Sequence, residues 1–358
     1  MAAHAPSTYI SFEALRDFAA AAFERVGLRP RDALAVAELI AEAELQGSEG
    51  HGIMRMPHYV RRIRAGGVNV APNIRVVEER AAMALVDGDN GMGHLVMKRA
   101  AEVAIDKART AGSAWVGTRW SNHAGPASLY ARMPLAEGMI GLYLAVGSAN
   151  HLPPWGGLDM LLSTNPISVA IPTLEEPPVV LDMATTVAAM GKVKTKMQRG
   201  EPLPEGWMVD REGKPLTDSK RGFEGLLLPI GGYKGYGLSL IFGLLAGTLN
   251  GAAMGKDVVD FNVDDTTHTN TGQAILAIDP AAFGDPTEFR RRVDSLVRDL
   301  RASERMPGVE RIWMPGEQSH AKRVEGRSRG IPIVPALRAS LDKLAAELGI
   351  QPLPGAHT

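Results

Sequence analysis

Residues 84–93 read Ala84-Leu85-Val86-Asp87-Gly88-Asp89-Asn90-Gly91-Met92-Gly93, and this stretch separates a strand from a helix. The apolar pattern from Ile74 to Asp87 predicts a strand, residues 88–91 predict a turn, and a helix is expected from about Leu95 to Thr110. Dinucleotide-binding folds carry Gly-x-Gly-x-x-Gly at such a junction, and the glycine spacing here is different. The stretch therefore predicts strands joined to helices without a Rossmann fingerprint.

Strands and helices alternate irregularly along the rest of the chain, and Ser11 is a candidate N-cap for the first helix. Outside 74–110, helices are expected at about 12–26, 31–46, 186–198, 235–250, 286–304 and 335–348, and strands at 114–118, 139–146, 169–172, 179–182 and 274–279. The helix at 31–46 is apolar almost all round, which predicts burial between other elements, and the helix at 235–250 is also expected to be buried. Strict strand–helix alternation is missing, so the pattern predicts an α/β or α+β domain flanked by helices, with 200–229 as an ordered surface excursion.

The composition is typical of a globular protein with two or three lobes. The chain has 358 residues, of which 45% are hydrophobic and 22% are charged, and its formal net charge is -1. Because no basic field exists and no apolar run could span a bilayer, neither nucleic acid nor a membrane is expected as a partner. Cysteine is absent, which excludes disulfides and thiolate metal sites. No secretory signal is visible in residues 1–8, so a cytoplasmic protein is expected.

The run Ser48-Glu49-Gly50-His51-Gly52-Ile53-Met54-Arg55 places a histidine and an arginine four residues apart. If a helix begins at Gly52, the two side chains share one helix face. A guanidinium beside an imidazole suits a small molecule with a carboxylate next to a proton-accepting C=O or C=N group. The alternative is a solvated pair on an exposed helix.

Two further stretches follow predicted strands. Ser121-Asn122-His123-Ala124-Gly125 carries a histidine on a strand-to-helix loop, where it is either catalytic or a cap of the next helix. In Asp182-Met183-Ala184-Thr185-Thr186, the carboxylate could orient an imidazole and the helix start could receive phosphate, or the cluster is an ordinary N-cap.

Glycines surround one lysine in Gly231-Gly232-Tyr233-Lys234-Gly235-Tyr236-Gly237-Leu238. The glycines permit close backbone approach and the lysine adds charge, so an anionic group such as a pyrophosphate fits; tight helix packing is the alternative. Pro315-Gly316-Glu317 is a turn whose glutamate could meet ribose hydroxyls. The run Gly251 to Asp257 is too short for a phosphate loop. The nine histidines do not cluster at ligand spacing, so no metal site is expected.

Six segments, in order along nearly the whole chain, resemble the malate/L-lactate dehydrogenase family that lies outside the Rossmann superfamily. That family also contains ureidoglycolate and sulfolactate dehydrogenases, diketogulonate reductase and Δ1-piperideine-2-carboxylate reductases. The matching segments are Gly50-His51-Gly52 with Arg55, Ser121 to Gly125 with Tyr130, Pro154-Trp155-Gly156-Gly157, Thr164-Asn165-Pro166-Ile167, Asp182 to Thr186, and Gly232 to Gly237.

The resemblance implies an NAD- or NADP-dependent oxidoreductase and a homodimer with active sites near the subunit interface. It also implies a seven-stranded, mostly antiparallel cofactor-binding sheet in residues 76–285, with an N-terminal helical segment, 1–75, packed against 286–358. Family roles then fall on these residues: His51, His123 and Asp182 as proton-transfer or orienting groups, Arg55 as the carboxylate clamp, and Ser148, Asp182, Met183, Ala184, Thr185, Lys234, Gly235, Gly316 and Glu317 as cofactor contacts.

One position departs from the family pattern. The family usually has Ser-His-Gly, whereas Gly50 precedes His51 here, so the missing hydroxyl must be replaced by Ser48 or by water. The resemblance predicts hydride transfer between nicotinamide and C2 of a small 2-hydroxy or 2-oxo acid, and the changed position bears on which acid. Reduction of a cyclic ketimine is the close alternative. Two hypotheses of a different class are a hydrolase triad of Ser121, His123 and Asp182, and a non-catalytic ligand-binding protein.

Overall fold

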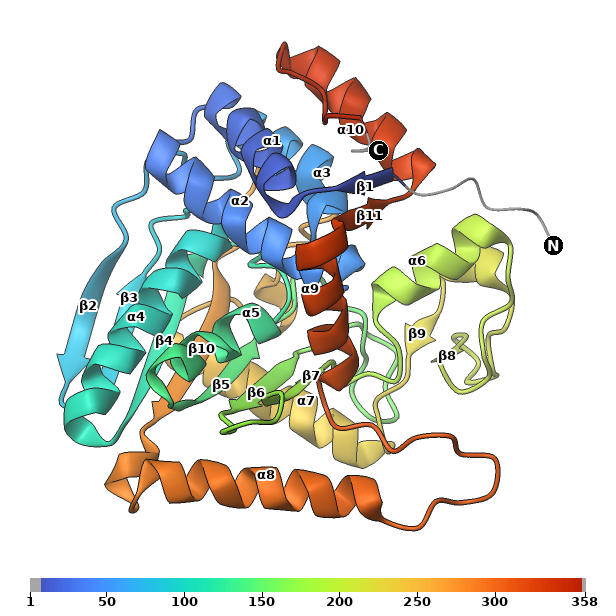
Figure 1. Ribbon diagram of the computed structural model, residues 1–358. Coiled ribbons are helices and arrows are strands. Elements are labelled where there is room, and N and C mark those ends of the chain that lie inside the picture. The colour runs from blue at the N-terminus through green and yellow to red at the C-terminus, as the bar shows by residue number, and fades with distance from the viewer. Residues whose placement is uncertain (1–7, 356–358) are drawn as a thin grey trace.

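The computed structural model describes residues 8–355, and its centre is a seven-stranded sheet with helices on both faces (Figure 1). In sheet order the strands are β2 (Arg75–Arg80), β3 (Met83–Asp87), β4 (Ser113–Ser121), β10 (Thr271–Ile278), β5 (Ile140–Ala145), β6 (Ile167–Ile171) and β7 (Val179–Met183). β3 and β4 run parallel, and every other neighbouring pair is antiparallel. The expected mixed α/β class with a mostly antiparallel seven-stranded sheet is confirmed.

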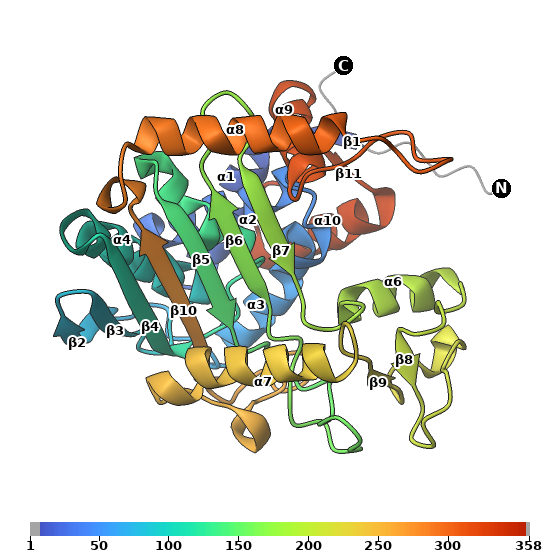
Figure 2. The ribbon, with the colours of Figure 1, turned by 90° about the horizontal axis from the view of Figure 1, so that it is seen from below.

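Helices cover both faces of the sheet. α4 (Gly93–Ala111) and α5 (Ser128–Ala131) lie on one face, while α7 (Tyr233–Ala246) and α8 (Pro286–Ala302) lie on the other (Figure 2). α4 is the crossover between parallel β3 and β4, and alanines line its buried side, so its backbone approaches the strands closely. This arrangement leaves the end of β4 pointing toward the N-terminal helices.

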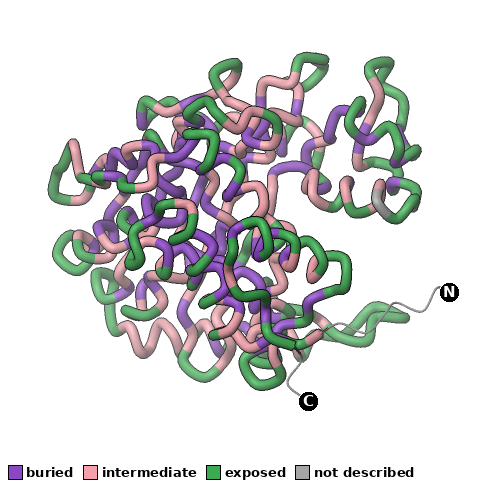
Figure 3. The backbone as a smooth tube through the Cα atoms, turned by 90° about the horizontal axis from the view of Figure 1, so that it is seen from above, coloured by how far each residue is buried: buried purple, intermediate pink, exposed green. Residues whose placement is uncertain are grey.

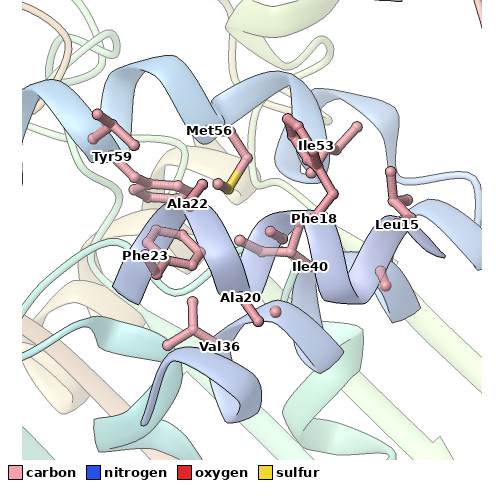
Figure 4. Packing of buried hydrophobic residues seen from close by; sticks show 14 of the residues in the cluster. Leu15, Phe18, Ala20, Ala22, Phe23, Val36, Ile40, Ile53, Met56 and Tyr59 are labelled. Atoms are coloured by element: carbon pink, nitrogen blue, oxygen red, sulfur yellow. The ribbon is translucent and has the colours of Figure 1, made fainter. Parts of the chain in front are cut away.

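The N-terminal helices form a second core together with the end of the chain. The elements are β1 (Thr8–Ile10), α1 (Phe12–Arg25), α2 (Pro30–Leu45), α3 (Met56–Arg64), α9 (Glu317–Arg329), β11 (Ile331–Ile333) and α10 (Pro335–Leu348). β1 pairs antiparallel with β11, which joins the two chain segments. Phe18, Phe23, Ile40 and Met56 pack between α1, α2 and α3 (Figure 4). Burial of these side chains holds α3, and the site residues beside it, against α1 and α2.

Residues 190–229 form a small projecting unit with its own apolar centre. Its elements are α6 (Met190–Arg199), β8 (Met208–Val209), η4 (Ser219–Arg221) and β9 (Leu226–Leu227). Val193, Leu203, Met208, Leu216 and Leu227 are buried inside it. Figure 3 shows the unit projecting from the rest of the chain, with exposed outer turns around a short buried stretch. The remaining short helices are η1 (Glu49–His51), η2 (Ile53–Arg55), η3 (Met133–Glu137), η5 (Thr248–Asn250), η6 (Gly255–Asp257) and η7 (Pro280–Ala282).

Of the local expectations, some are confirmed and three are wrong, and one helix is not predicted at all. Ser11 caps α1, because its Oγ accepts the Ala14 N–H at 3.1 Å. The strand expected over 74–87 is instead the hairpin of β2 and β3. No helix begins at Gly52, since two short 3₁₀ turns precede α3. The sequence does not predict α9, because its mostly charged residues carry no apolar stripe.

The third wrong expectation concerns α7, which is not enclosed on all sides. Leu238, Ile241 and Leu244 are 41%, 51% and 40% exposed, so one apolar side of the helix faces outward. Within residues 8–355, no helix is both long and apolar enough to cross a bilayer. The segment in which no secretory signal is expected lies, except for Thr8, outside the described residues.

Candidate active site

The two predicted histidines lie together, one in the turn before α3 and the other in the loop after β4. His51 ends η1, and His123 lies two residues after β4. Their rings are stacked, with centroids 5.6 Å apart and planes 7° from parallel. Phe261 stacks on His123 at 5.1 Å. Residues that are 72 positions apart in the sequence thus form one aromatic stack.

Arg55 also lies in this site, but the backbone that places it there is not the continuous helix that was expected. Gly52 separates η1 from η2, so His51 and Arg55 do not lie on one continuous helix face. Arg55 Nε donates to the Gly50 carbonyl at 2.9 Å, and Nη1 donates to Asn262 Oδ1 at 3.2 Å. No carboxylate of the described residues forms a salt bridge with Arg55. Its guanidinium is oriented by neutral groups and keeps its charge for an anion.

Tyr59 orients His123. The Tyr59 hydroxyl is hydrogen bonded to His123 Nδ1 at 2.6 Å, and the tyrosine is almost fully buried in α3. None of the described side chains makes a hydrogen bond to His123 Nε2. The arrangement fixes the ring through one nitrogen and leaves the other for a ligand.

Both histidines are held in their neutral forms. Burial lowers the pKa of His51 to about 4, and the positive charge of Arg55 contributes to that lowering. Burial and then Arg55 hold the pKa of His123 well below its usual range. At neutral pH both imidazoles are therefore uncharged. An anion placed on Arg55 would cancel the repulsion and raise both pKa values.

Asp182 lies on β7 and makes a different contact from the one expected. Asp182 as a whole residue is exposed. Its carboxylate is nevertheless directed at the protein, because Oδ2 accepts the Ser128 N–H at 3.0 Å. Burial of the carboxylate raises the pKa of Asp182, and the Ser128 N–H opposes that rise. Asp182 is hydrogen bonded to neither histidine, so Tyr59 rather than Asp182 orients His123. Ser121 is fully buried and donates to the Asn122 carbonyl, and no Ser121–His123–Asp182 triad forms.

The segments expected to hold a cofactor converge beside β7. The Ile230 N–H donates to the Thr185 carbonyl at 3.0 Å, which brings the start of the glycine–lysine segment next to Asp182–Thr185. The Val180 N–H donates to the Pro315 carbonyl at 3.0 Å, which brings Gly316 to the same strand. Three segments distant in sequence thus meet at one exposed sheet edge.

This edge fits an anionic cofactor. A Cβ on Gly231 would meet no atom within 4 Å, so the backbone there lies open. Lys234 is exposed at the start of α7, and no carboxylate of the described chain pairs with it. Open backbone, a helix start and an unpaired ammonium group together suit a phosphate-bearing molecule.

Two expected cofactor residues have other partners. Glu317 pairs with Arg301 at 3.3 Å and with Arg311, and its carboxylate also accepts the Met314 N–H at 3.0 Å. Its oxygens are thus occupied by protein groups rather than open to ribose hydroxyls. Ser148 lies nearer to the histidines, because its carbonyl accepts the N–H of Phe261 at 2.9 Å. Ser48 is half-buried, and its carbonyl accepts the His51 N–H at 2.8 Å.

Sequence reasoning missed three residues of this site. Tyr59 stands four residues after Arg55, and that spacing was the available signal for it. Phe261 and Asn262 lie in a loop more than 200 positions from Arg55 and carried no motif. Only the tertiary fold brings them to the histidines.

The sequence pattern of a family described as malate/L-lactate dehydrogenase matches residues 10–342. The chain belongs to this family. It is similar to the malate dehydrogenase of Pyrococcus horikoshii, with 37% identity over 92% of this chain and 92% of the relative. It is also similar to the L-sulfolactate dehydrogenase of Methanocaldococcus jannaschii, with 36% identity over 91% and 93%. The expected family and its oxidoreductase class are confirmed.

Solved structures agree with this membership. The malate dehydrogenase structure from Pyrococcus horikoshii OT3 superposes with a TM-score of 0.88, 35% identity and 97% coverage of both chains. The Δ1-piperideine-2-carboxylate reductase structure from Pseudomonas syringae pvar. tomato has a TM-score of 0.83 and 32% identity, covering 94% of this chain and 99% of the other. Further relatives are named ureidoglycolate dehydrogenase (NAD(+)) and (2R)-3-sulfolactate dehydrogenase (NADP(+)), which supports a nicotinamide cofactor in general.

Proposed function

We propose that this dehydrogenase interconverts a 2-hydroxy acid and its 2-oxo acid, with Arg55 binding the substrate carboxylate and the His51–His123 pair handling the proton. The observation that supports this most directly is an arginine without a carboxylate partner beside two stacked neutral histidines. A small acid has one group for each: a carboxylate for the guanidinium fork and a C2 oxygen for an imidazole.

Arg55 acts first in this proposal by fixing the substrate. A guanidinium can bind a carboxylate through two parallel hydrogen bonds, which sets both position and orientation. The contacts from Arg55 to Gly50 and Asn262 hold the fork before substrate arrives, so little side-chain entropy is lost on binding. Bound in this way, C2 lies beside the histidines rather than free in the site.

The proton on the C2 oxygen then passes to or from an imidazole. We assign this role to His123, because Tyr59 fixes its Nδ1 and leaves Nε2 for the substrate. His51 stacks against it and helps to exclude water from that side. Once the substrate carboxylate neutralises Arg55, the pKa of His123 rises toward the range in which it can also donate. The same residue can thus serve both directions of the reaction.

The hydride is exchanged by a nicotinamide when one is bound. Gly231, Lys234 and the Asp182–Thr185 edge of β7 would hold its diphosphate and sugar parts. Lys234 supplies positive charge, and the open glycine backbone allows close contact. No contact of the described residues distinguishes NAD from NADP.

We also propose that a second copy of this chain covers α7. This helix has no polar side, and its outward residues form an apolar surface that water would otherwise meet. The exposed apolar residues on α7, in the turn after it and beside its start are Tyr233, Leu238, Ile241, Leu244, Leu249 and Trp155. Because α7 begins beside the proposed cofactor edge, a homodimer through this surface would place a partner near each active site.

The experiment is a panel of 2-oxo acids assayed with NADH and with NADPH, followed by nicotinamide absorbance. Turnover of one or more linear 2-oxo acids is the expected result. A fluorescence titration in which neither nicotinamide binds would contradict the proposal. The pair of reduced cofactors in the panel also decides which of them this chain uses.

Reduction of a cyclic ketimine is the second candidate, favoured by the likeness to the Δ1-piperideine-2-carboxylate reductase structure. Its substrate also presents a carboxylate next to the reacting carbon, so the Arg55 clamp would serve unchanged. Adding cyclic imino acids to the same panel separates the two, because a ketimine reductase will turn over the imines with the higher kcat/KM.

A further inference from the structure

Glu44 is a buried carboxyl group that the proposed mechanism does not use. It lies in the last turn of α2, only 7% exposed, and the described residues offer it no cationic partner. A buried carboxylate without a cation is costly, so a site that keeps one has a use for it.

Glu44 contacts the junction between η1, which ends at His51, and η2, which ends at Arg55. Its Oε1 accepts the Ile53 N–H at 2.7 Å. Gly52 is the residue between the turns, and a Cβ there would lie only 2.1 Å from the same oxygen. The glutamate therefore fills the space that the glycine leaves, and any other residue at 52 would displace it.

This hydrogen bond fixes two functional side chains through the backbone. His51 directly precedes Gly52, and Arg55 ends the turn that begins at Ile53. The Ile53 N–H is one of the first amides of the helical run that continues into α3, so it has no partner within that run. A negative carboxylate at this end also interacts favourably with the helix dipole.

We propose that Glu44 is a positioning residue. Its carboxylate accepts the Ile53 N–H and so fixes His51 relative to Arg55. When the carboxylate takes up a proton, this hydrogen bond weakens and the two side chains are no longer fixed relative to each other. The proposal rests on the proposed function, because it concerns how the carboxylate clamp and the histidine pair are aligned. Glu44 touches no reacting atom and acts only through the backbone of residues 52 and 53.

The electrostatic surroundings place this proton exchange near neutral pH. Burial raises the pKa of Glu44 to about 7, the Ile53 N–H opposes that rise, and the charge of Glu49 adds to it. On α9, Arg323 is paired with Glu42 at 2.5 Å, and Lys322 lies over Gly47. From α4, the neutral His94 faces the site, and α1 contributes apolar side chains. Because protonated Glu44 loses the charge-assisted bond, the junction is firm above about pH 7 and loose below it.

The first test compares the wild-type chain with Glu44→Gln, which keeps the shape and one acceptor oxygen but cannot ionise. We expect the KM for a 2-oxo acid to rise about 10-fold in the variant at pH 8.5, with a smaller change in kcat. As pH falls through 7, the wild-type KM should show an additional rise that the variant lacks. Glu38→Gln is the matched control, because it removes the same charge from an exposed position on the same helix.

A merely structural glutamate would give a different result. In that case Glu44→Gln would keep the wild-type pH profile and a KM within twofold of the wild type, and the proposal would be overturned. His51 and His123 titrate in the same way in both proteins, so only the difference between the two pH profiles reports on Glu44.

A second test does not depend on turnover. NMR spectra of histidine-labelled wild type should show the His51 ring resonances shifting as Glu44 titrates near pH 7, and Glu44→Gln should remove that step. Unchanged His51 resonances across pH 7 in the wild type would refute the coupling, even if the enzyme reduces 2-oxo acids well. Conversely, the step can be present in a chain that turns over no acid, which would contradict the proposed function and leave the coupling established.

Discussion

The Tyr59 hydroxyl lies 2.6 Å from Nδ1 of His123, and this contact joins α3 of the N-terminal helices to the loop that follows β4. The tyrosine ring also packs against Phe23 at 6.4 Å and against Phe261 at 5.9 Å between centroids. The orientation of His123 is therefore set by a residue whose own ring is held by the N-terminal core.

Replacing Tyr59 with Phe should lower kcat by about 10-fold to 10²-fold, because the ring stays packed but His123 loses its orienting hydrogen bond. The lost bond should reduce the free energy of unfolding by only about 1–2 kcal/mol. Steady-state kinetics and urea unfolding measure the two effects separately. A variant with the wild-type kcat would show that His123 is not the proton-transfer residue, or that its ring needs no partner.

Replacing Arg55 with Lys should lower kcat/KM by about 10²-fold, mostly through KM, since a single ammonium cannot reproduce two parallel hydrogen bonds to a carboxylate. Arg61→Lys is the matched control: Arg61 lies on α3 and pairs with Asp265 at the surface, where an ion pair contributes little. If Arg55→Lys retains wild-type kcat/KM, the carboxylate is bound elsewhere.

The sequence predicts the features of this site that depend on neighbouring residues, and it misses those that depend on residues far apart in the chain. The helix expected at Pro335–Leu348 matches α10, because a proline at its start and Gly349 after its end are local signals. The site histidines and Arg55 were found from short motifs. The Tyr59–His123 contact was not, because 64 residues separate the pair and no local pattern reports such a distance.

The errors have a similar cause. Spacing alone places His51 and Arg55 on one helix, but Gly52 and the buried Glu44 break the run into two 3₁₀ turns, which no periodicity shows. The apolar sequence of α7 predicts burial on all sides, yet one side is exposed in the structure. A sequence pattern shows that a surface is apolar and not which part of the fold packs against it.

Acid should destabilise the fold through its buried histidines. His94 is fully buried and neither ring nitrogen has a hydrogen-bond partner among the described residues, and burial lowers its pKa to about 3. A histidine with a lowered pKa in the folded state contributes stability above its unfolded value, near 6.5, and that stability is lost as pH falls. The expected loss is roughly 1.4 kcal/mol per pH unit between about 6.5 and 3.

Calorimetry on His94→Leu checks this, because leucine cannot be protonated. The Tm of the variant should fall less than that of the wild type between pH 7 and pH 5, whatever its absolute value at pH 7. His51 and His58, with pKa values lowered to about 4 by burial, remain and add the same trend in both proteins. Parallel Tm curves for the two proteins would show that His94 is not neutralised by the fold.

A charge on the exposed side of α7 should separate the proposed dimer. Ile241 is 51% exposed in the single chain, so Ile241→Glu should leave the fold intact and still oppose burial between two copies. Sedimentation velocity should show a monomer for this variant and a dimer for the wild type. Phe283→Glu, which alters a residue 85% exposed in the turn before α8, is the control and should remain dimeric. A wild-type monomer, or a dimeric Ile241→Glu, would exclude this surface as the interface.

Gly50→Ser should restore the family's usual Ser-His-Gly and change substrate preference without harming the fold. A Cβ at Gly50 meets no atom within 4 Å, so the added side chain fits, and the free energy of unfolding should change by no more than about 0.5 kcal/mol. The Gly50 carbonyl, which accepts from Arg55 Nε at 2.9 Å, remains in place. The new hydroxyl stands beside His51 and can bond a polar group on the substrate.

We expect the ratio of kcat/KM between two 2-oxo acids that differ at C3 to move by about threefold to tenfold, the range that one neutral hydrogen bond supplies. Gly50→Ala is the matched control, because it adds the Cβ without the hydroxyl. If serine and alanine shift the ratio equally, space rather than hydrogen bonding sets the preference. If neither shifts it, residue 50 does not face the substrate, and the specificity of this chain must lie in groups beyond the His51–Arg55 turns.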